Sequence, residues 1–151
     1  MKRFFKIIGI ICTVIVALLI LLIVVAAMNS SDADERFTPF INEAIPKLAS
    51  WDRQPYQDLM TEEGFSALSD NQWNLYLSKV SRLGHLVSIG EPEQQSVVSS
   101  SYTSSGSSVK AQYLVPVEFD TGPAHITLTL IEQDEQIRIH YIKLHSDLLL
   151  E

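Results

Sequence analysis

The sequence predicts an α+β protein, in which an N-terminal transmembrane helix precedes about three helices packed on a curved antiparallel sheet. Residues 7–27 form an unbroken apolar run. Apolar side chains then recur every three or four residues as far as residue 83, and every second residue from residue 85 onward. The first period is that of a helix and the second that of a strand. A series of helices followed by a series of strands is typical of the α+β class.

The distribution of charge narrows the classes of function. The chain has 151 residues, with 11 basic and 18 acidic side chains and a net charge of −7. Three of the positive charges, on Lys2, Arg3 and Lys6, precede the apolar run, so the rest of the chain is strongly acidic. This balance excludes a cationic nucleic-acid binder, and we expect no nucleic acid partner. The roughly 110 residues of the acidic domain leave room for one modest core, which excludes a multidomain enzyme.

The apolar run predicts a membrane anchor whose partner is the lipid bilayer. Residues 7–27 contain no charged side chain, and a helix of this length spans roughly 30 Å, the thickness of the hydrocarbon core of a bilayer. A cleaved signal peptide is the alternative. Its apolar region is usually only about 7–15 residues long, so we expect the anchor to be retained.

The basic end predicts the orientation of the chain. Short basic flanks stay in the cytoplasm, so residues 1–6 should lie inside and the acidic domain should be extracytoplasmic. In a bacterium with two membranes, the anchor would lie in the inner (cytoplasmic) membrane and the domain in the periplasm. The single cysteine, Cys12, lies in the apolar run, so the outer domain has no disulfide and no thiol-based metal site.

Residues 28–35 are small and acidic and predict a linker, followed by one domain over residues 36–146 and a tail at 147–151. Thr38-Pro39 suits the start of the first helix of the domain, and Pro46 should kink that helix. The predicted buried face of this helix consists of Phe37, Phe40, Ile41, Ala44, Leu48 and Trp51.

Two further helices are expected. Gln54-Pro55 opens a short helix that Gly64 ends. Ser69 and Gln72 then form a capping box at the start of the third helix, and Gly84 suits a left-handed C-cap at its end. The apolar stripe of this third helix consists of Trp73, Tyr76, Leu77, Val80 and Leu83.

The strands begin after Gly84. His85–Glu91 reads as a first strand, and the serine-rich residues 96–108 are either a flexible loop or a solvated edge strand. We favour two strands that flank a long serine-rich hairpin. The next strand alternates most regularly, with Val109, Ala111, Tyr113, Val115, Val117 and Phe119 on one face.

Two turns fix the expected register of the last three strands. A turn at Thr121-Gly122 would place Phe119 opposite Ala124 and Val117 opposite Ile126. A second turn at Asp134-Glu135 would place Leu130 opposite Ile139 and Leu128 opposite Tyr141. All of these pairs would share one apolar face, which the helices should cover.

A set of motifs between Leu48 and Ser146, about two thirds of the chain, carries a resemblance to a known family. These motifs are Trp51, Tyr56, Leu59-Met60, Ser69–Trp73, Leu83-Gly84, Tyr113–Phe119 and Ile137–Ile142. With them the stretch resembles the cone-shaped nuclear-transport-factor-like (cystatin-like) superfamily and, within it, small membrane-anchored extracytoplasmic domains of bacteria. The resemblance implies a pocket between the sheet and the first helix.

No catalytic residue, metal ligand or cofactor is indicated. Glu118 and Asp120 are expected on the outer, solvated face of the sheet, where acidic residues normally favour solubility. His140, expected opposite Thr129, and His125 are placed on that same face but too far apart to share a metal. His85 is expected to complement the C-terminus of the third helix.

The leading interpretation is a non-enzymatic, single-pass membrane protein whose domain binds another envelope protein or a second copy of the chain. The expected docking surface is a mixed apolar patch on the outer sheet face, formed by Leu114, Ile131, Ile142 and Leu144. The alternative is a small-molecule binding domain with a pocket lined by Trp51, Tyr113 and Tyr141. The third reading is an enzyme that uses Glu118, Asp120 or His140.

Overall fold

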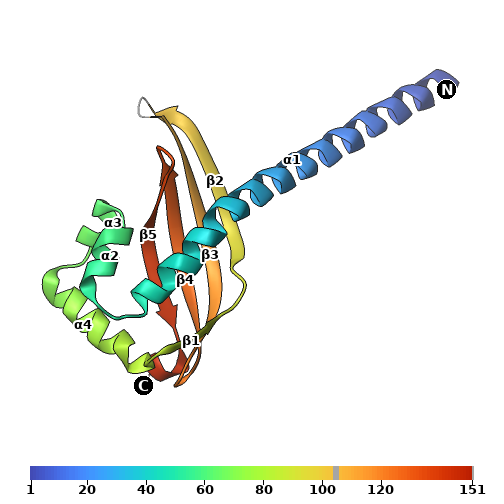
Figure 1. Ribbon diagram of the computed structural model, residues 1–151. Helices are drawn as coiled ribbons and strands as arrows, with labels where there is room; N and C mark the ends of the chain where they lie inside the picture. The colour runs from blue at the N-terminus through green and yellow to red at the C-terminus, as the bar shows by residue number, and fades with distance from the viewer. Residues whose placement is uncertain (104–105, 151) are drawn as a thin grey trace. The chain divides into compact units, whose positions relative to one another are not determined.

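The computed structural model describes residues 1–103 and 106–150 (Figure 1). It confirms the α+β class, with helices first and five antiparallel strands after them. The chain divides into two compact units, Met1–Asp34 and Glu35–Glu151. Helix α1 (Lys2–Leu48) contributes to both units.

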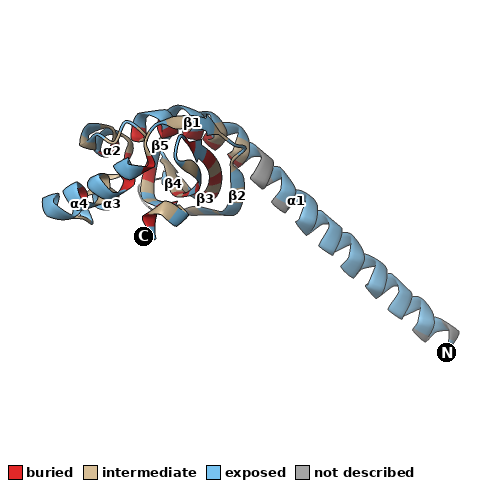
Figure 2. Cartoon of the chain, turned by 90° about the horizontal axis from the view of Figure 1, so that it is seen from below, coloured by how far each residue is buried: buried red, intermediate tan, exposed pale blue. Residues whose placement is uncertain are grey.

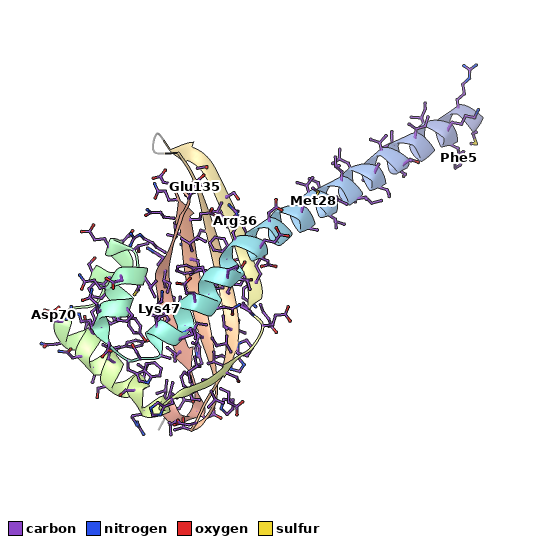
Figure 3. All side chains as sticks on the ribbon, in the orientation of Figure 1. Phe5, Met28, Arg36, Lys47, Asp70 and Glu135 are labelled. Atoms are coloured by element: carbon purple, nitrogen blue, oxygen red, sulfur yellow. The ribbon has the colours of Figure 1, made fainter. Side chains whose placement is uncertain are left out.

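The first unit is the apolar part of α1. Residues Phe5–Val25 form a helical segment long and apolar enough to cross a membrane, with a mean hydropathy of 3.5 and none of it buried. Side chains such as those of Phe5 and Met28 project freely from this part of the helix (Figure 3). This segment is therefore compatible with a membrane anchor.

Residues 28–35 are helical, and no helix begins at Thr38-Pro39, because α1 runs through both segments without a break. The prediction of a separate linker and a new helix start is wrong in this respect. Pro39 and Pro46 both lie inside the helix and both are exposed. A proline leaves one backbone carbonyl without its helical partner. On an exposed face that carbonyl can bond to water, so the helix tolerates both prolines.

The sheet consists of β1 (Leu86–Ile89), β2 (Glu93–Thr103), β3 (Gly106–Phe119), β4 (Gly122–Gln133) and β5 (Gln136–His145). Its order is β1-β3-β4-β5, and β2 also pairs with β3. β1 pairs with the end of β3 and β2 with its earlier part, so together they form one interrupted edge. The serine-rich stretch is thus part of an edge strand as far as Thr103, and positions 104 and 105 lie outside the described residues.

The interruption between β1 and β2 lies opposite Pro116. The amide of Gly90 donates to the carbonyl oxygen of Pro116 at 2.7 Å. Pro116 has no amide hydrogen to return a bond on that side, and a proline inside a strand is tolerated only where the neighbouring strand is absent or interrupted. The proline therefore determines where the edge is broken.

The predicted turn between β3 and β4 is wrong by one residue. The turn is Asp120-Thr121, so that Phe119 pairs with Gly122 and Val117 with Ala124. Contacts to the preceding helix hold this turn, since the Thr121 hydroxyl donates to the Leu83 carbonyl at 2.7 Å and the Asp120 amide to the His85 carbonyl at 2.9 Å. The register therefore shifts by two residues, which leaves every side chain on its predicted face.

The turn between β4 and β5 is confirmed at Asp134-Glu135, with φ of 52° and 62°, and Leu130 pairs with Ile139 as predicted. A β-bulge at His140 then shifts the register, because Leu128 pairs with Ile142 and Thr129 with Tyr141. The predicted pairing of Leu128 with Tyr141 is wrong. One extra residue in β5 exchanges the faces of everything that follows it.

The expected second helix is two helices, α2 (Arg53–Leu59) and α3 (Glu62–Ser66). The chain breaks at Thr61, whose amide donates to the Ile139 carbonyl at 2.8 Å and whose hydroxyl accepts from the Gly64 amide at 3.0 Å. The segment between the two helices is thus tied to β5. Both views show α2, α3 and α4 beside β5 (Figures 1 and 2).

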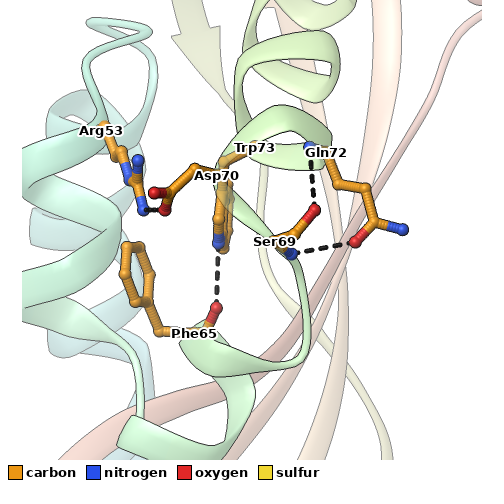
Figure 4. Close-up of polar contacts among 6 residues, drawn as sticks. All are labelled: Arg53, Phe65, Ser69, Asp70, Gln72 and Trp73. Atoms are coloured by element: carbon orange, nitrogen blue, oxygen red, sulfur yellow. Dashed lines mark hydrogen bonds and ion pairs between the residues drawn. The ribbon is translucent and has the colours of Figure 1, made fainter.

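Helix α4 (Asp70–Val80) begins as predicted. The Ser69 hydroxyl accepts from the Gln72 amide, and the Gln72 side chain accepts from the Ser69 amide at 2.9 Å (Figure 4). A 3₁₀ turn at Ser81–Leu83 follows, and Gly84 caps this turn with a positive φ of 80° but a ψ of −137°, so the predicted left-handed cap is confirmed only in the sign of φ. A second 3₁₀ turn, Asp147–Leu149, ends the described chain.

The main core lies between the last turns of α1 and the concave face of the sheet, where buried residues gather inside the curl of the strands (Figure 2). The rings of Phe37 and Tyr113 pack with centroids 5.9 Å apart, and Arg36 pairs with Glu132 of β4 at 2.7 Å (Figure 3). The core residues from α1 and the sheet are Phe37, Ile41, Ala44, Ile45, Leu48, Ala111, Tyr113, Val115, Val117, Phe119, Ala124, Ile126, Leu128, Leu130 and Ile139.

Candidate binding groove

Two cavities follow the outer edge of β5, where α3 and α4 face the strand. The smaller, of about 280 Å³, is here called the apolar pocket, and the larger, of about 640 Å³, the basic pocket. Tyr76 of α4 lines both, so the two are neighbours, and together they are called the edge groove. The apolar pocket is lined by Met60, Glu63, Gly64, Ala67, Leu68, Trp73, Tyr76, His140, Tyr141 and Ile142. The basic pocket is lined by Tyr76, Lys79, Val80, Pro123, His125, Lys143, Leu144, His145, Ser146, Asp147, Leu149 and Leu150.

The groove begins where the cover of the β5 edge ends. β5 is the last strand of the sheet. Met60 forms a parallel bridge with Ile139, and Gly64 packs against the carbonyl group of His140 so closely that a Cβ atom there would overlap its oxygen. Within the described residues, the bond from Thr61 to Ile139 is the one backbone hydrogen bond that reaches this edge from outside the sheet. Among the residues that the structure describes, no strand pairs with the edge from Tyr141 to His145.

Contacts within the protein hold the walls of the apolar pocket in place. The indole nitrogen of Trp73 donates to the Phe65 carbonyl at 2.9 Å, and the two rings stack with centroids 5.0 Å apart (Figure 4). The guanidinium group of Arg53 lies 5.3 Å from the centre of the Phe65 ring and pairs with Asp70. The rings of Tyr56, Trp73 and Tyr76 pack within 6.1 Å of one another. This aromatic cluster holds α2, α3 and α4 together.

Two tyrosine hydroxyls of this cluster are buried without a partner. In the part of the chain that the structure describes, neither hydroxyl has a partner in good hydrogen-bond geometry, although the phenols of Tyr56 and Tyr76 interact with each other. Burial is the largest cause that raises the pKa of both phenols; the Tyr76 phenol raises the pKa of Tyr56 further, whereas for Tyr76 the contact with Tyr56 lowers the pKa and Tyr141 raises it. Both phenols therefore stay neutral, and the Tyr76 side chain, which lines both pockets, keeps hydrogen-bonding capacity for a ligand.

His140 is not on the outer face where it was predicted. The bulge places it against α3, where its Nδ1 lies 3.1 Å from the Thr61 hydroxyl, and it lines the apolar pocket. Tyr141, the next residue, also lines this pocket and is 50% exposed. The bulge thus brings two consecutive side chains to one end of the groove.

The basic pocket concentrates positive charge in an acidic domain. Its lining contains Lys79, His125, Lys143 and His145 but one carboxylate, that of Asp147. His125 and His145 are directly opposite each other on β4 and β5. Among the described residues, none of these four basic side chains forms an ion pair. They are therefore available to an anionic group.

The three aromatic residues predicted to line one pocket lie apart. Tyr113 is fully buried under α1. Trp51 follows α1 with φ of 60°, donates its indole N–H to the Gly84 carbonyl at 2.8 Å and packs on Phe119. Of the three, Tyr141 lines the apolar pocket, whereas Tyr113 belongs to the main core between α1 and the sheet. The apolar pocket lies at the edge of the sheet.

The four residues of the predicted docking patch lie in two places. Leu114 and Ile131 are on the outer sheet face and are half-buried. Because of the bulge, Ile142 and Leu144 face the opposite side, where they line the apolar and the basic pocket respectively. The sequence did contain a signal for this exchange of faces, since the apolar positions of β5 change phase from Ile137 and Ile139 to Ile142 and Leu144.

The groups considered for catalysis do not meet. His85 bonds to Asp120, with Nδ1 3.1 Å from the carboxylate, and these two residues join the helix end to the β3–β4 turn. That hydrogen bond holds the pKa of Asp120 below its usual range. Glu118 is exposed on β3, whereas His140 lies in the edge groove. Within the described ranges, no three histidine, cysteine or acidic side chains are grouped as a metal site would require.

No protein-family model matches the chain, and no curated protein matches its sequence.

Proposed function

We propose that the protein is a single-pass, membrane-anchored binding module that holds a partner of the cell envelope in the edge groove. The observation that carries this proposal is the groove itself, because an unpaired strand edge lies beside two preformed cavities. Soluble domains usually cover such an edge, since it pairs readily with other chains. The segment Phe5–Val25 would keep this surface close to a membrane.

The proposed orientation places the N-terminus in the cytoplasm of a bacterial inner membrane and the domain outside, since Lys2, Arg3 and Lys6 flank the apolar segment. We further propose membership of the nuclear-transport-factor-like superfamily, which the helices-then-meander order supports. A role without catalysis fits the separation of Glu118, Asp120 and His140 described above.

A small-molecule binding domain is the second candidate function. The apolar pocket supports it, because a cavity of about 280 Å³ with aromatic walls and an unpaired hydroxyl is typical of a ligand site. The two candidates differ in the extent of the surface used, since a small ligand needs one pocket and a protein partner needs the whole groove.

Photo-crosslinking in intact membranes tests the leading proposal. A benzoylphenylalanine in place of Ala67, which lines the apolar pocket, should give an adduct with a protein partner on irradiation. The same group in place of the adjacent, exposed Ser66 is the matched control, because Ser66 lies outside both cavities. Equal yields at the two positions, or an adduct at neither, would contradict the proposal.

Sidedness is tested with the same part of the chain. A Ser66→Cys variant in a Cys12→Ser background should react with a membrane-impermeant maleimide added outside the cytoplasmic membrane, whereas Lys6→Cys should react only after permeabilisation. The reverse pattern would place the domain in the cytoplasm.

A further inference from the structure

We propose that the edge groove binds an extended peptide segment that pairs with β5 as an additional strand and places a carboxylate in the basic pocket. This inference rests on the proposed function and specifies the chemistry of the partner. Three features of the groove carry it, namely the free backbone of β5, the apolar pocket and the positive charge beyond it.

The backbone of β5 supplies the first feature. From Tyr141 to His145 the strand continues past the cover that Met60, Thr61 and Gly64 provide. Alternate amides and carbonyls of an edge strand point away from the sheet, and a peptide in the extended conformation can satisfy them. Five residues of strand offer a pairing length of about 17 Å.

The apolar pocket would select which side chain of the peptide segment can bind beside β5. An extended segment beside β5 would direct alternate side chains toward the walls made by Trp73, Tyr76 and Leu68. A branched aliphatic or aromatic side chain would fill this cavity, and the unpaired Tyr76 hydroxyl could bond to the main chain of the segment. β2, the opposite edge of the sheet, borders neither cavity, which is why we assign the segment to β5.

The basic pocket would favour a negatively charged group on the peptide segment, and the position of that group depends on the direction in which the segment runs. It lies at the end of β5 that contains Lys143 and His145, with Lys79 of α4 beside it. A segment that runs parallel to β5 would bring its terminal carboxylate to the ammonium groups of Lys79 and Lys143, and an antiparallel segment would use an acidic side chain instead. A carboxylate paired with a lysine ammonium group forms a charge-assisted hydrogen bond, stronger than a neutral one.

The experiment uses the full chain in lipid nanodiscs and a displayed library of eight-residue peptides with free C-termini. The enriched peptides should contain an apolar residue followed by a carboxylate. Methylation of alternate backbone nitrogens on one side of the peptide should weaken binding at least tenfold, because those nitrogens would donate to β5. Amidation of the C-terminus, or replacement of an acidic residue by its amide, distinguishes the terminal carboxylate from a side-chain carboxylate.

Variants of the groove locate the site. Ala67→Trp, which fills the apolar pocket, should abolish binding, while Ser66→Trp should not. Lys143→Gln should weaken the peptide that carries the carboxylate about tenfold and leave unaffected the peptide in which that carboxylate is replaced by an amide, whereas Lys110→Gln, a basic residue of β3 outside the groove, should change neither. The affinity lost on removing the lysine and the affinity lost on removing the carboxylate form a double-mutant cycle, which isolates the contribution of the ion pair.

Three results would overturn the inference, namely a library without enrichment, equal affinity of the methylated peptides, or equal affinity for the Lys143→Gln variant. If crosslinking through position 67 persists after such a result, the proposed function stands and the partner docks in another conformation. If a small apolar molecule binds the groove and peptides do not, the second candidate function replaces both proposals.

Discussion

The two helical sides of the domain differ in how completely they are packed. Under the last turns of α1, Phe37, Ile41 and Ile45 are fully buried against the middle of the sheet. Beside β5, Trp73 is buried, but Tyr76 is half-buried and Tyr141 is half-exposed around two cavities. A helix that crosses the centre of a sheet meets side chains from several strands, whereas a helix beyond its edge meets one strand and leaves space. The packed side stabilises the domain, and the edge side is available for binding.

The cause of the difference is local. The bulge at His140 turns Ile142 and Leu144 toward α4, and Thr61 and Gly64 hold α3 against the strand only as far as residue 140. Bulges commonly occur at sheet edges and near sites, where they redirect side chains. One inserted residue and two short contacts therefore separate the covered part of β5 from the open part.

The largest effect is expected on the packed side. Leu128→Ala should lower the free energy of unfolding by about 2–5 kcal/mol, because it removes a fully buried side chain and leaves a cavity. Leu128→Asp should prevent folding. Denaturant unfolding followed by tryptophan fluorescence measures both. Leu75→Ala on α4 is the control, since Leu75 is 71% exposed and its loss should change stability by less than about 0.5 kcal/mol. A similar decrease in the free energy of unfolding for Leu128→Ala and Leu75→Ala would contradict the proposed difference in packing between the two sides.

A smaller effect is expected where the two sides meet. Gly64→Ala would force a methyl group into the carbonyl oxygen of His140, so α3 must move away from β5. The expected cost is about 1–3 kcal/mol, the usual range for overpacking. Hydrogen exchange should show faster opening of Thr61 than in the parent chain, because its amide bonds to Ile139. Ser66→Ala on the same helix is the control, and unchanged protection at Thr61 in Gly64→Ala would contradict this account of the contact.

The edge side should respond differently to removal of a polar atom. Tyr76→Phe removes a buried hydroxyl without a partner, so stability should stay the same or rise, by up to about 1 kcal/mol. In the peptide-binding assay the same variant should bind the peptide more weakly, because the Tyr76 hydroxyl would bond to the main chain of the bound peptide. Tyr141→Phe, at an exposed ring, is the control for stability. A stability loss above about 1 kcal/mol for Tyr76→Phe would mean that the hydroxyl is already bonded in the free protein.

The sequence predicted the packed side better than the edge side, for physical reasons. The helix face that contains Phe37 and Ile41 and the alternation from Ala111 to Phe119 depend on local period, and both were confirmed. The capping box at Ser69 and the turn at Asp134-Glu135 depend on a few adjacent residues and were also confirmed. Local patterns of this kind are legible without knowledge of the rest of the chain.

The edge groove depends largely on contacts between distant residues, which local patterns do not encode. The bulge at His140 is stabilised where Thr61 bonds to Ile139, 78 positions further along the chain, and the turn at Asp120 is held by His85. The prediction continued the phase of Ile137 and Ile139 through Tyr141, and this gave the wrong face for Ile142 and Leu144, where the apolar phase in fact changes. Tyr141 was predicted to line a ligand pocket beneath the first helix of the domain, and it lines a cavity beside α4 instead.

The smallest effect is expected at the junction between the helix end and the β3–β4 turn, which belongs to neither side. The His85 side chain lowers the pKa of Asp120 in the folded chain, so the ionised carboxylate favours folding above the pKa that Asp120 has when unfolded. This contribution is lost as the pH falls through the lower pKa of the folded state.

His85→Ala should therefore raise the pKa of Asp120 and destabilise the domain slightly at neutral pH, and the difference from the parent chain should vanish in acid. Carboxyl NMR titration gives the pKa, and urea unfolding at several pH values gives the stability. Since both groups are exposed, the effect must stay far below that of Leu128→Ala; a comparable effect would mean that this surface pair, and not the core under α1, determines the stability of the fold.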